Sequence, residues 1–103
     1  MKLASLTLLA GWIAVAAAQT QEAPALLQKY SCYICHANDE TVTGPPYVAM
    51  AAKYRGNPEA VSIVAATVKK GAHGSGPWHM PPSPQVSAAD ARKIAEYILA
   101  LQP

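Results

Sequence analysis

The stretch Cys32-Tyr33-Ile34-Cys35-His36 (CYICH) contains the only two cysteines of this 103-residue chain and places a histidine directly after the second one. Residues at positions i, i+3 and i+4 of a helix share one face, so the side chains of Cys32, Cys35 and His36 can point at one object. C-x-x-C-H is the attachment signature of c-type haem. The motif therefore predicts one covalent haem c, with thioether bonds from Cys32 and Cys35 and with His36 as an iron ligand.

Three other uses of paired cysteines fit the sequence less well. A disulfide between Cys32 and Cys35 would be strained on a helix and would close almost no loop, so it would stabilise little. A zinc site needs four ligands, and outside the motif the chain offers only His73 and His79 as further histidines. A thioredoxin-like dithiol is expected in a βαβ context, and the sequence contains no strand signal.

The N-terminal stretch is typical of an export signal. Lys2 forms a short basic region, residues 3–15 form an apolar core, and the three alanines at 16–18 fit the small-x-small rule for cleavage. We expect residues 1–18 to be a signal peptide and residues 19–103 to be a single domain in the periplasm, with an uncleaved membrane anchor as the alternative. Export agrees with haem attachment, which requires reduced thiols and free haem outside the cytoplasm.

The composition limits the classes of function. The predicted mature part has 85 residues (103 minus 18) and the chain lacks phenylalanine, so a core made of protein alone would be marginal. A buried haem would supply the missing apolar core. Without Lys2 the chain has seven Lys+Arg (8 minus 1) against six Asp+Glu, a formal net charge of +1. This charge gives no electrostatic footprint for nucleic acid.

The hydrophobic pattern predicts an all-α fold of about four helices wrapped around the haem. The first helix opens at Pro24 and leads into the motif, and the second runs from about residue 47 to residue 54. The apolar residues of the third and fourth segments recur at i, i+3, i+4 and i+7, which is typical of one buried helix face.

The third and fourth helices also have recognisable ends. Asn57 is expected to cap the third helix, and Gly71 to close it. Ser87 and Asp90 have the spacing of a capping box at the start of the fourth helix. Between these two helices, residues 72–84 are so rich in glycine and proline that we expect a loop without regular structure that wraps around a bound group.

The second axial ligand of the iron must come from elsewhere in the chain. Met80 precedes two prolines that fix the backbone, whereas Met50 lies inside a short helix, where a methionine is more often a core residue. His79 and Met80 are neighbours, and neighbours in extended backbone point to opposite sides, so only one of the two can reach the iron. The spacing alone favours Met80 and leaves His79 open. The candidates are Met50, His73, His79 and Met80.

Four stretches of the chain resemble the small bacterial monohaem class I cytochromes c. They are LLQKYSCYICH (26–36), TGPPYVAMAAKY (43–54), MPP (80–82) and VSAADARKIAEYIL (86–99). The resemblance implies that Met80 is the second axial ligand. It also implies that the carbonyl of Pro45 accepts the Nδ1 hydrogen of His36 and orients the imidazole. Without that role, Pro45 and Pro46 would simply break the loop before the second helix.

The chain departs from this family pattern at two places. Many members have a tryptophan several residues before the methionine ligand, where it bonds a haem propionate. Here Ser75 is near that point, and Trp78 is two residues before Met80. Ser83 stands where an asparagine often follows the methionine. We keep Trp78 as a candidate haem contact.

A haem iron bound by both His36 and Met80 has no open position for oxygen, peroxide or substrate. We therefore expect a protein that is not an enzyme, takes no small-molecule substrate and shuttles single electrons between redox proteins. The main alternative is a tightly bound haem c subunit of a periplasmic dehydrogenase or reductase complex. A haem sensor or peroxidase would need a displaceable sixth ligand. Electrons are expected to pass through an apolar patch formed by Tyr33, Ile34, Val48, Trp78 and Pro81.

Overall fold

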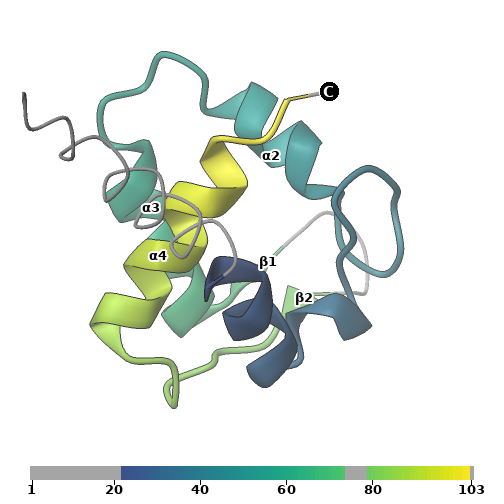
Figure 1. Ribbon diagram of the computed structural model, residues 1–103, viewed down its shortest axis with the longest axis vertical. Helices are drawn as coiled ribbons and strands as arrows, with labels where there is room; N and C mark the ends of the chain where they lie inside the picture. Colours follow the sequence, from purple (N-terminus) through teal and green to yellow (C-terminus); the bar gives the residue numbers. More distant parts are fainter. Residues whose placement is uncertain (1–21, 74–78, 103) are drawn as a thin grey trace, which may run out of the picture.

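The computed structural model of the protein describes residues 22–73 and 79–102, and most of them are helical (Figure 1). In Figure 1, α4 crosses the middle of the molecule and α2 and α3 pack against it. Within these described ranges, no helix is both long enough and apolar enough to cross a membrane. The helices are a first helix covering residues 22–29, the 3₁₀ turn η1 (Cys32–Ile34), α2 (Tyr47–Lys53), α3 (Ala60–Lys70) and α4 (Ala88–Leu99).

The capping box of α4 is present as predicted, whereas the start of α3 differs from the prediction. The Ser87 side chain accepts a hydrogen bond of 3.1 Å from the backbone N–H of Asp90. The Asn57 side chain accepts one of 2.8 Å from the backbone N–H of Glu59, but α3 begins only at Ala60. The prediction that Asn57 is the N-cap is therefore wrong, because Asn57 begins a separate turn before the helix, in which its carbonyl accepts from the N–H of Ala60 at 3.1 Å.

Two polar side-chain contacts join the first helix and Tyr30, which follows it, to α4. Pro24 lies inside this helix and not at its start as predicted, since residues 22 and 23 are already helical. The Tyr30 hydroxyl donates a 2.6 Å hydrogen bond to Asp90, and this bond raises the pKa of Tyr30. Lys93 forms a 2.8 Å ion pair with Glu22. These two links place the segment before the CYICH motif against α4.

The hydrophobic core lies between the first helix, α2, α3 and α4. Ile94 and Ile98 are one helical turn apart on α4 and only 1% and 2% exposed. Burial of a side chain of this size stabilises the fold by about 1.5–3 kcal/mol. Because α4 contacts α2, α3 and the first helix, it fixes the segment before the motif relative to α2. The core cluster consists of Leu26, Leu27, Tyr47, Val68, Val86, Ala91, Ile94 and Ile98.

Part of the predicted irregular loop is regular. Strands β1 (Ala72–His73) and β2 (His79–Met80) pair antiparallel, with Ala72 opposite Met80 and His73 opposite His79. The prediction that residues 72–84 lack regular structure is therefore wrong at these four residues. Two-residue strands are too short to show an alternating pattern in a sequence.

Candidate functional site

The CYICH motif forms a single helical turn. Beyond η1, the backbone N–H groups of Cys35 and His36 both donate to the carbonyl of Cys32, at 3.2 and 3.1 Å. Ser31 precedes the turn in the left-handed conformation, with φ 63° and ψ 27°, and separates η1 from the first helix. Both thiols are free and half-buried, and burial raises the pKa of the Cys32 thiol. The predicted clustering of the two thiols and the imidazole on one turn is thus present.

His36 is buried and its ring has a defined orientation. The side chain is 9% exposed, and Nδ1 lies 2.8 Å from the carbonyl oxygen of Pro45. A carbonyl can only accept, so Nδ1 carries the hydrogen and donates it. The lone pair of the imidazole is then on Nε2, the nitrogen that is available to a metal ion.

The loop after the motif is folded back onto the motif by backbone hydrogen bonds. The N–H groups of Thr43 and Gly44 donate to the carbonyl of Cys35, at 3.1 and 2.6 Å. At the start of α2, the N–H groups of Tyr47 and Val48 donate at 2.9 Å to the carbonyls of residues 37 and 38. The first N–H groups of a helix have no partner within it, so the loop supplies these partners. Pro45 lies between the two sets of bonds and is held opposite His36.

Gly44 touches the His36 ring so closely that no side chain fits there. A Cβ built on Gly44 would lie within 3.0 Å of three atoms of the imidazole. The Gly-Pro pair therefore has two roles: Gly44 lets the backbone approach the ring, and Pro45 supplies the carbonyl. The sequence reasoning noted the pair but missed the contact of Gly44, for which the signal was a glycine next to the predicted acceptor.

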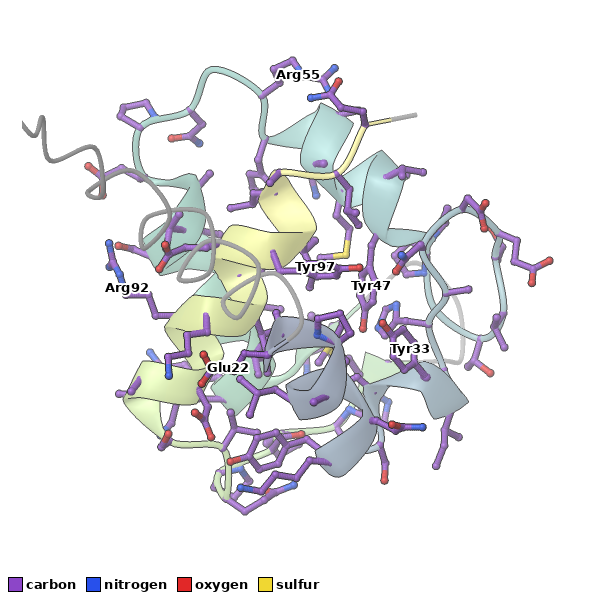
Figure 2. All side chains as sticks on the ribbon, viewed as in Figure 1. Glu22, Tyr33, Tyr47, Arg55, Arg92 and Tyr97 are labelled. Carbon is purple, nitrogen blue, oxygen red and sulfur yellow. The ribbon has the colours of Figure 1, made fainter. Side chains whose placement is uncertain are left out.

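Tyr33 of the motif lies close to two other tyrosines, Tyr47 and Tyr97 (Figure 2). The Tyr47 ring stacks on the His36 ring, with centroids 5.0 Å apart and an interplanar angle of 20°. The Tyr33 ring lies 6.4 Å from that of Tyr47, and Tyr97 of α4 is a neighbour of both. Burial raises the pKa of Tyr33 and that of Tyr47. The sequence analysis treated Tyr47 only as the start of a helix and missed its contact with His36.

Three of the four candidates for the second axial ligand lie on the β ribbon, and Met50 lies on α2. Side chains alternate along a strand, so Met80 shares a face with Ala72 and points away from His79. Met80 is half-buried, whereas His73 and His79 are exposed. Met50 packs against the core cluster, which agrees with its interpretation as a core residue.

Gly71 fixes the backbone that carries Met80. Its φ of 80° and ψ of −179° belong to a region that only glycine adopts readily. A Cβ on Gly71 would overlap the carbonyl oxygen of Met80 and the backbone of Pro81 and Pro82. The end of α3 and the start of the MPP segment are therefore in direct backbone contact.

The residues of the motif and its loop fit a covalent haem. Two half-buried free thiols and an imidazole with its Nε2 lone pair available occupy one turn, and Pro45 and Gly44 restrain the imidazole. Met80 comes from a separate segment, β2. Trp78, the candidate propionate contact, lies outside the described residues, as does Ser75.

Comparison with known proteins gives the family. The family model described as cytochrome c matches residues 20–102. This chain belongs to the cytochrome c family. Cytochrome c-551 of Allochromatium vinosum is 40% identical to it over 77 residues, which cover 74% of this cytochrome and 82% of that protein. Cytochrome c-552 of Nitrosomonas europaea is 36% identical over 105 residues, which cover 99% of this cytochrome and 100% of that one.

Solved structures agree with the sequence comparison. The crystal structure of wild-type Nitrosomonas europaea cytochrome c552 matches this cytochrome with a TM-score of 0.73 and 38% identity, over 77% of this chain and 99% of that chain. The predicted all-α, small class I cytochrome c fold and the predicted covalent haem c are therefore confirmed. This cytochrome is an electron carrier.

Proposed function

We propose that this cytochrome is a periplasmic one-electron carrier in which His36 and Met80 are the axial ligands of the haem iron. When bound, the haem supplies a one-electron Fe(III)/Fe(II) couple. The observation that carries the proposal is the 2.8 Å hydrogen bond from Nδ1 of His36 to the carbonyl of Pro45. That bond fixes the tautomer that directs Nε2 to a metal, and it raises the basicity of the imidazole.

The ligand role of Met80 is supported by the backbone around it. Gly71 contacts the backbone of the MPP segment, and two prolines follow the methionine, so few backbone conformations remain open to this segment. His79 faces the opposite side of the ribbon, next to His73. A thioether is also the ligand that raises the potential of a c-type haem, as suits an electron carrier.

Ligation of the iron by two protein side chains explains why the protein would carry electrons and would not act as an enzyme. With His36 and Met80 bound, no axial position remains for oxygen, peroxide or a small substrate. Because neither ligand is exchanged, electron transfer requires little rearrangement of the protein. The partners of such a carrier are other redox proteins.

The surface around the motif offers a place for such partners. Tyr33, Ile34 and Val42 are large apolar side chains that are 38%, 72% and 50% exposed. An apolar patch of this kind suits brief docking next to the cysteines. It also suits the alternative, a permanent contact as the haem c subunit of a periplasmic dehydrogenase or reductase complex. Purification from the native host separates the two, because a subunit would elute with its catalytic partner.

Periplasmic location is proposed from the N-terminal sequence, residues 1–18, which lies outside the described residues. Cell fractionation and the intact mass of the haem protein test it. A mature chain that begins at Gln19 and is released with the periplasmic fraction supports the proposal. An uncleaved chain in the membrane fraction contradicts it.

Absorption spectra of the oxidised and reduced protein test the axial ligands. We expect the oxidised protein to have a weak far-red sulfur-to-iron band that disappears in Met80→Ala and persists in Met50→Ala and His79→Ala. The reduced wild type should not bind carbon monoxide. Persistence of the band in Met80→Ala, its loss in Met50→Ala, or ready binding of carbon monoxide by the wild type would show that the ligand assignment is wrong.

A further inference from the structure

The face of the β ribbon opposite Met80 carries two histidines side by side. His73 of β1 and His79 of β2 are paired across the strands, and their rings have centroids 5.4 Å apart with an interplanar angle of 31°. Both side chains are exposed. The third histidine of the chain, His36, is buried beside Pro45 and is not part of this pair.

The spacing of the two rings suits one tetrahedral metal ion. In a zinc site each imidazole nitrogen lies about 2.0–2.1 Å from the ion, so two imidazoles on one tetrahedral ion have centroids roughly 5 Å apart. The observed 5.4 Å is close to this value. A square-planar ion with two adjacent imidazoles would require ring centroids nearer to each other than the observed 5.4 Å.

We propose that His73 and His79 form a surface site for one Zn²⁺ ion, with the two imidazoles as its protein ligands and water completing the tetrahedron. In the part of the chain that the structure describes, no group of three or more His, Cys, Asp or Glu side chains is placed to hold a metal. The site is therefore weaker than a structural zinc centre, and its occupancy follows the zinc concentration around the protein. The neighbouring charges along the chain are Lys69 and Lys70, whose positive charges also weaken the binding of a dication.

Zinc at this site would join the two strands of the ribbon. β2 also carries Met80, so a bound ion would restrain the segment of the proposed iron ligand. That consequence rests on the proposed function, whereas zinc binding itself does not. Zinc is redox-inert, so it can be studied on the oxidised haem protein without changing the charge of the iron.

Calorimetric titration of the oxidised holoprotein with Zn²⁺ at about pH 7.5, where neutral imidazole is the ligating form, tests the site. We expect one ion per chain in the wild type. We expect binding to be about tenfold or more weaker in His73→Ala and in His79→Ala, because each variant loses the second ligand of a chelating pair. The same zinc concentration should also raise the midpoint of thermal unfolding of the wild type by more than that of either variant.

A matched control keeps the number of histidines constant. Ser62 is an exposed residue of α3, and the double variant His73→Ala/Ser62→His has three histidines but no pair on the ribbon. It should bind zinc as weakly as His73→Ala. Should an alanine variant fail to incorporate haem, His73→Gln and His79→Gln replace it. Equal zinc affinity in the wild type and the single variants, rescue by Ser62→His, or no binding by the wild type overturns the proposal.

The zinc titration and the ligand test can be told apart. Loss of the far-red band in Met80→Ala concerns the iron ligand and leaves His73 and His79 in place. Zinc binding that depends on both histidines would stand if Met50 proved to be the ligand, whereas ligation of the iron by His79 would overturn the zinc site as well.

Discussion

A Cβ at Gly44 would lie within 3.0 Å of three atoms of the His36 imidazole, so this glycine and this histidine form a contact that leaves no room for a methyl group. Two further neighbours restrain the same ring: the carbonyl of Pro45 accepts from Nδ1, and Tyr47 stacks on the ring. The orientation of the proposed iron ligand is thus set before any metal is considered. Preorganisation of this kind lowers the rearrangement that accompanies electron transfer.

The first prediction is that Gly44→Ala displaces the His36 ring. The added methyl group meets the ring and the fixed loop, and overpacking of this kind costs about 1–3 kcal/mol of unfolding free energy. We expect a lower yield of haem protein and a shifted Soret band in the protein that is recovered. Denaturant unfolding and the absorption spectrum measure the two effects.

Gly56→Ala is the control for this variant. Gly56 has a φ of 83°, and nothing lies within 4 Å of the position that an added methyl group would take, so its substitution adds backbone strain without a clash. Its haem spectrum should match that of the wild type. If Gly44→Ala also keeps the wild-type spectrum and loses no more stability than Gly56→Ala, the contact of Gly44 with His36 affects neither the haem site nor the stability.

The second prediction concerns the contact between Gly71 and the MPP segment. Gly71→Ala combines a strained φ of 80° with overlap at the carbonyl of Met80, so the segment that carries the proposed ligand has to move. Backbone strain alone costs about 1–3 kcal/mol. We expect the far-red band to weaken and the reduced protein to bind carbon monoxide. Gly56 has nearly the same φ but no atom near the added methyl group, so Gly56→Ala should keep the far-red band and should not bind carbon monoxide. Equal spectra for Gly71→Ala and Gly56→Ala would contradict the prediction.

The elements that the sequence predicts well are those with short-range causes. The motif places Cys32, Cys35 and His36 within one turn because helical spacing is local. The capping box at Ser87 and the apolar spacing along α4 likewise depend on neighbours three or four residues away. These signals were enough to predict the helices and the haem attachment.

The features that the sequence did not reveal depend on distant contacts. The β ribbon needs Gly71 to turn the chain at the end of α3, and two-residue strands leave no periodic signal. The contact of Gly44 and the stacking of Tyr47 arise only when the loop folds back onto Cys35 and His36. The role of the Pro45 carbonyl as the acceptor for His36 was predicted only from the family resemblance. Every residue has a backbone carbonyl, so the residue type does not show which carbonyl will accept.

The third prediction is that Ser31→Gly stabilises the protein. Ser31 adopts a left-handed conformation with φ 63°, which costs a residue with a Cβ about 1–2 kcal/mol. Glycine relieves this cost but has a more flexible unfolded state, so the net gain should be up to about 1 kcal/mol. The same substitution at Ser62, inside α3, should instead cost about 0.5 kcal/mol, because glycine is a poorer helix former than serine. Denaturant unfolding of the two holoproteins gives both values, and a loss of stability in Ser31→Gly would contradict the assignment of strain.

The fourth prediction is that Tyr47 makes the protein sensitive to alkaline pH. Burial raises the pKa of this phenol above its ordinary value of 10.0, so the folded protein keeps the proton that the unfolded chain releases. The contribution of the Tyr47 proton to the free energy of unfolding is fully present below pH 10.0. It is lost as the pH rises from there towards the pKa of Tyr47 in the folded protein.

The measurement is the free energy of unfolding in denaturant at several pH values from about 9 to 12, which bracket the ordinary pKa of tyrosine. Above pH 10 the wild type should lose up to about 1.4 kcal/mol per pH unit more than Tyr47→Phe, which keeps the ring on His36 but has no proton to release. Tyr33 is 38% exposed, so Tyr33→Phe should change the slope less. Parallel curves for the wild type and Tyr47→Phe would mean that the Tyr47 hydroxyl ionises equally easily in the folded and unfolded chains.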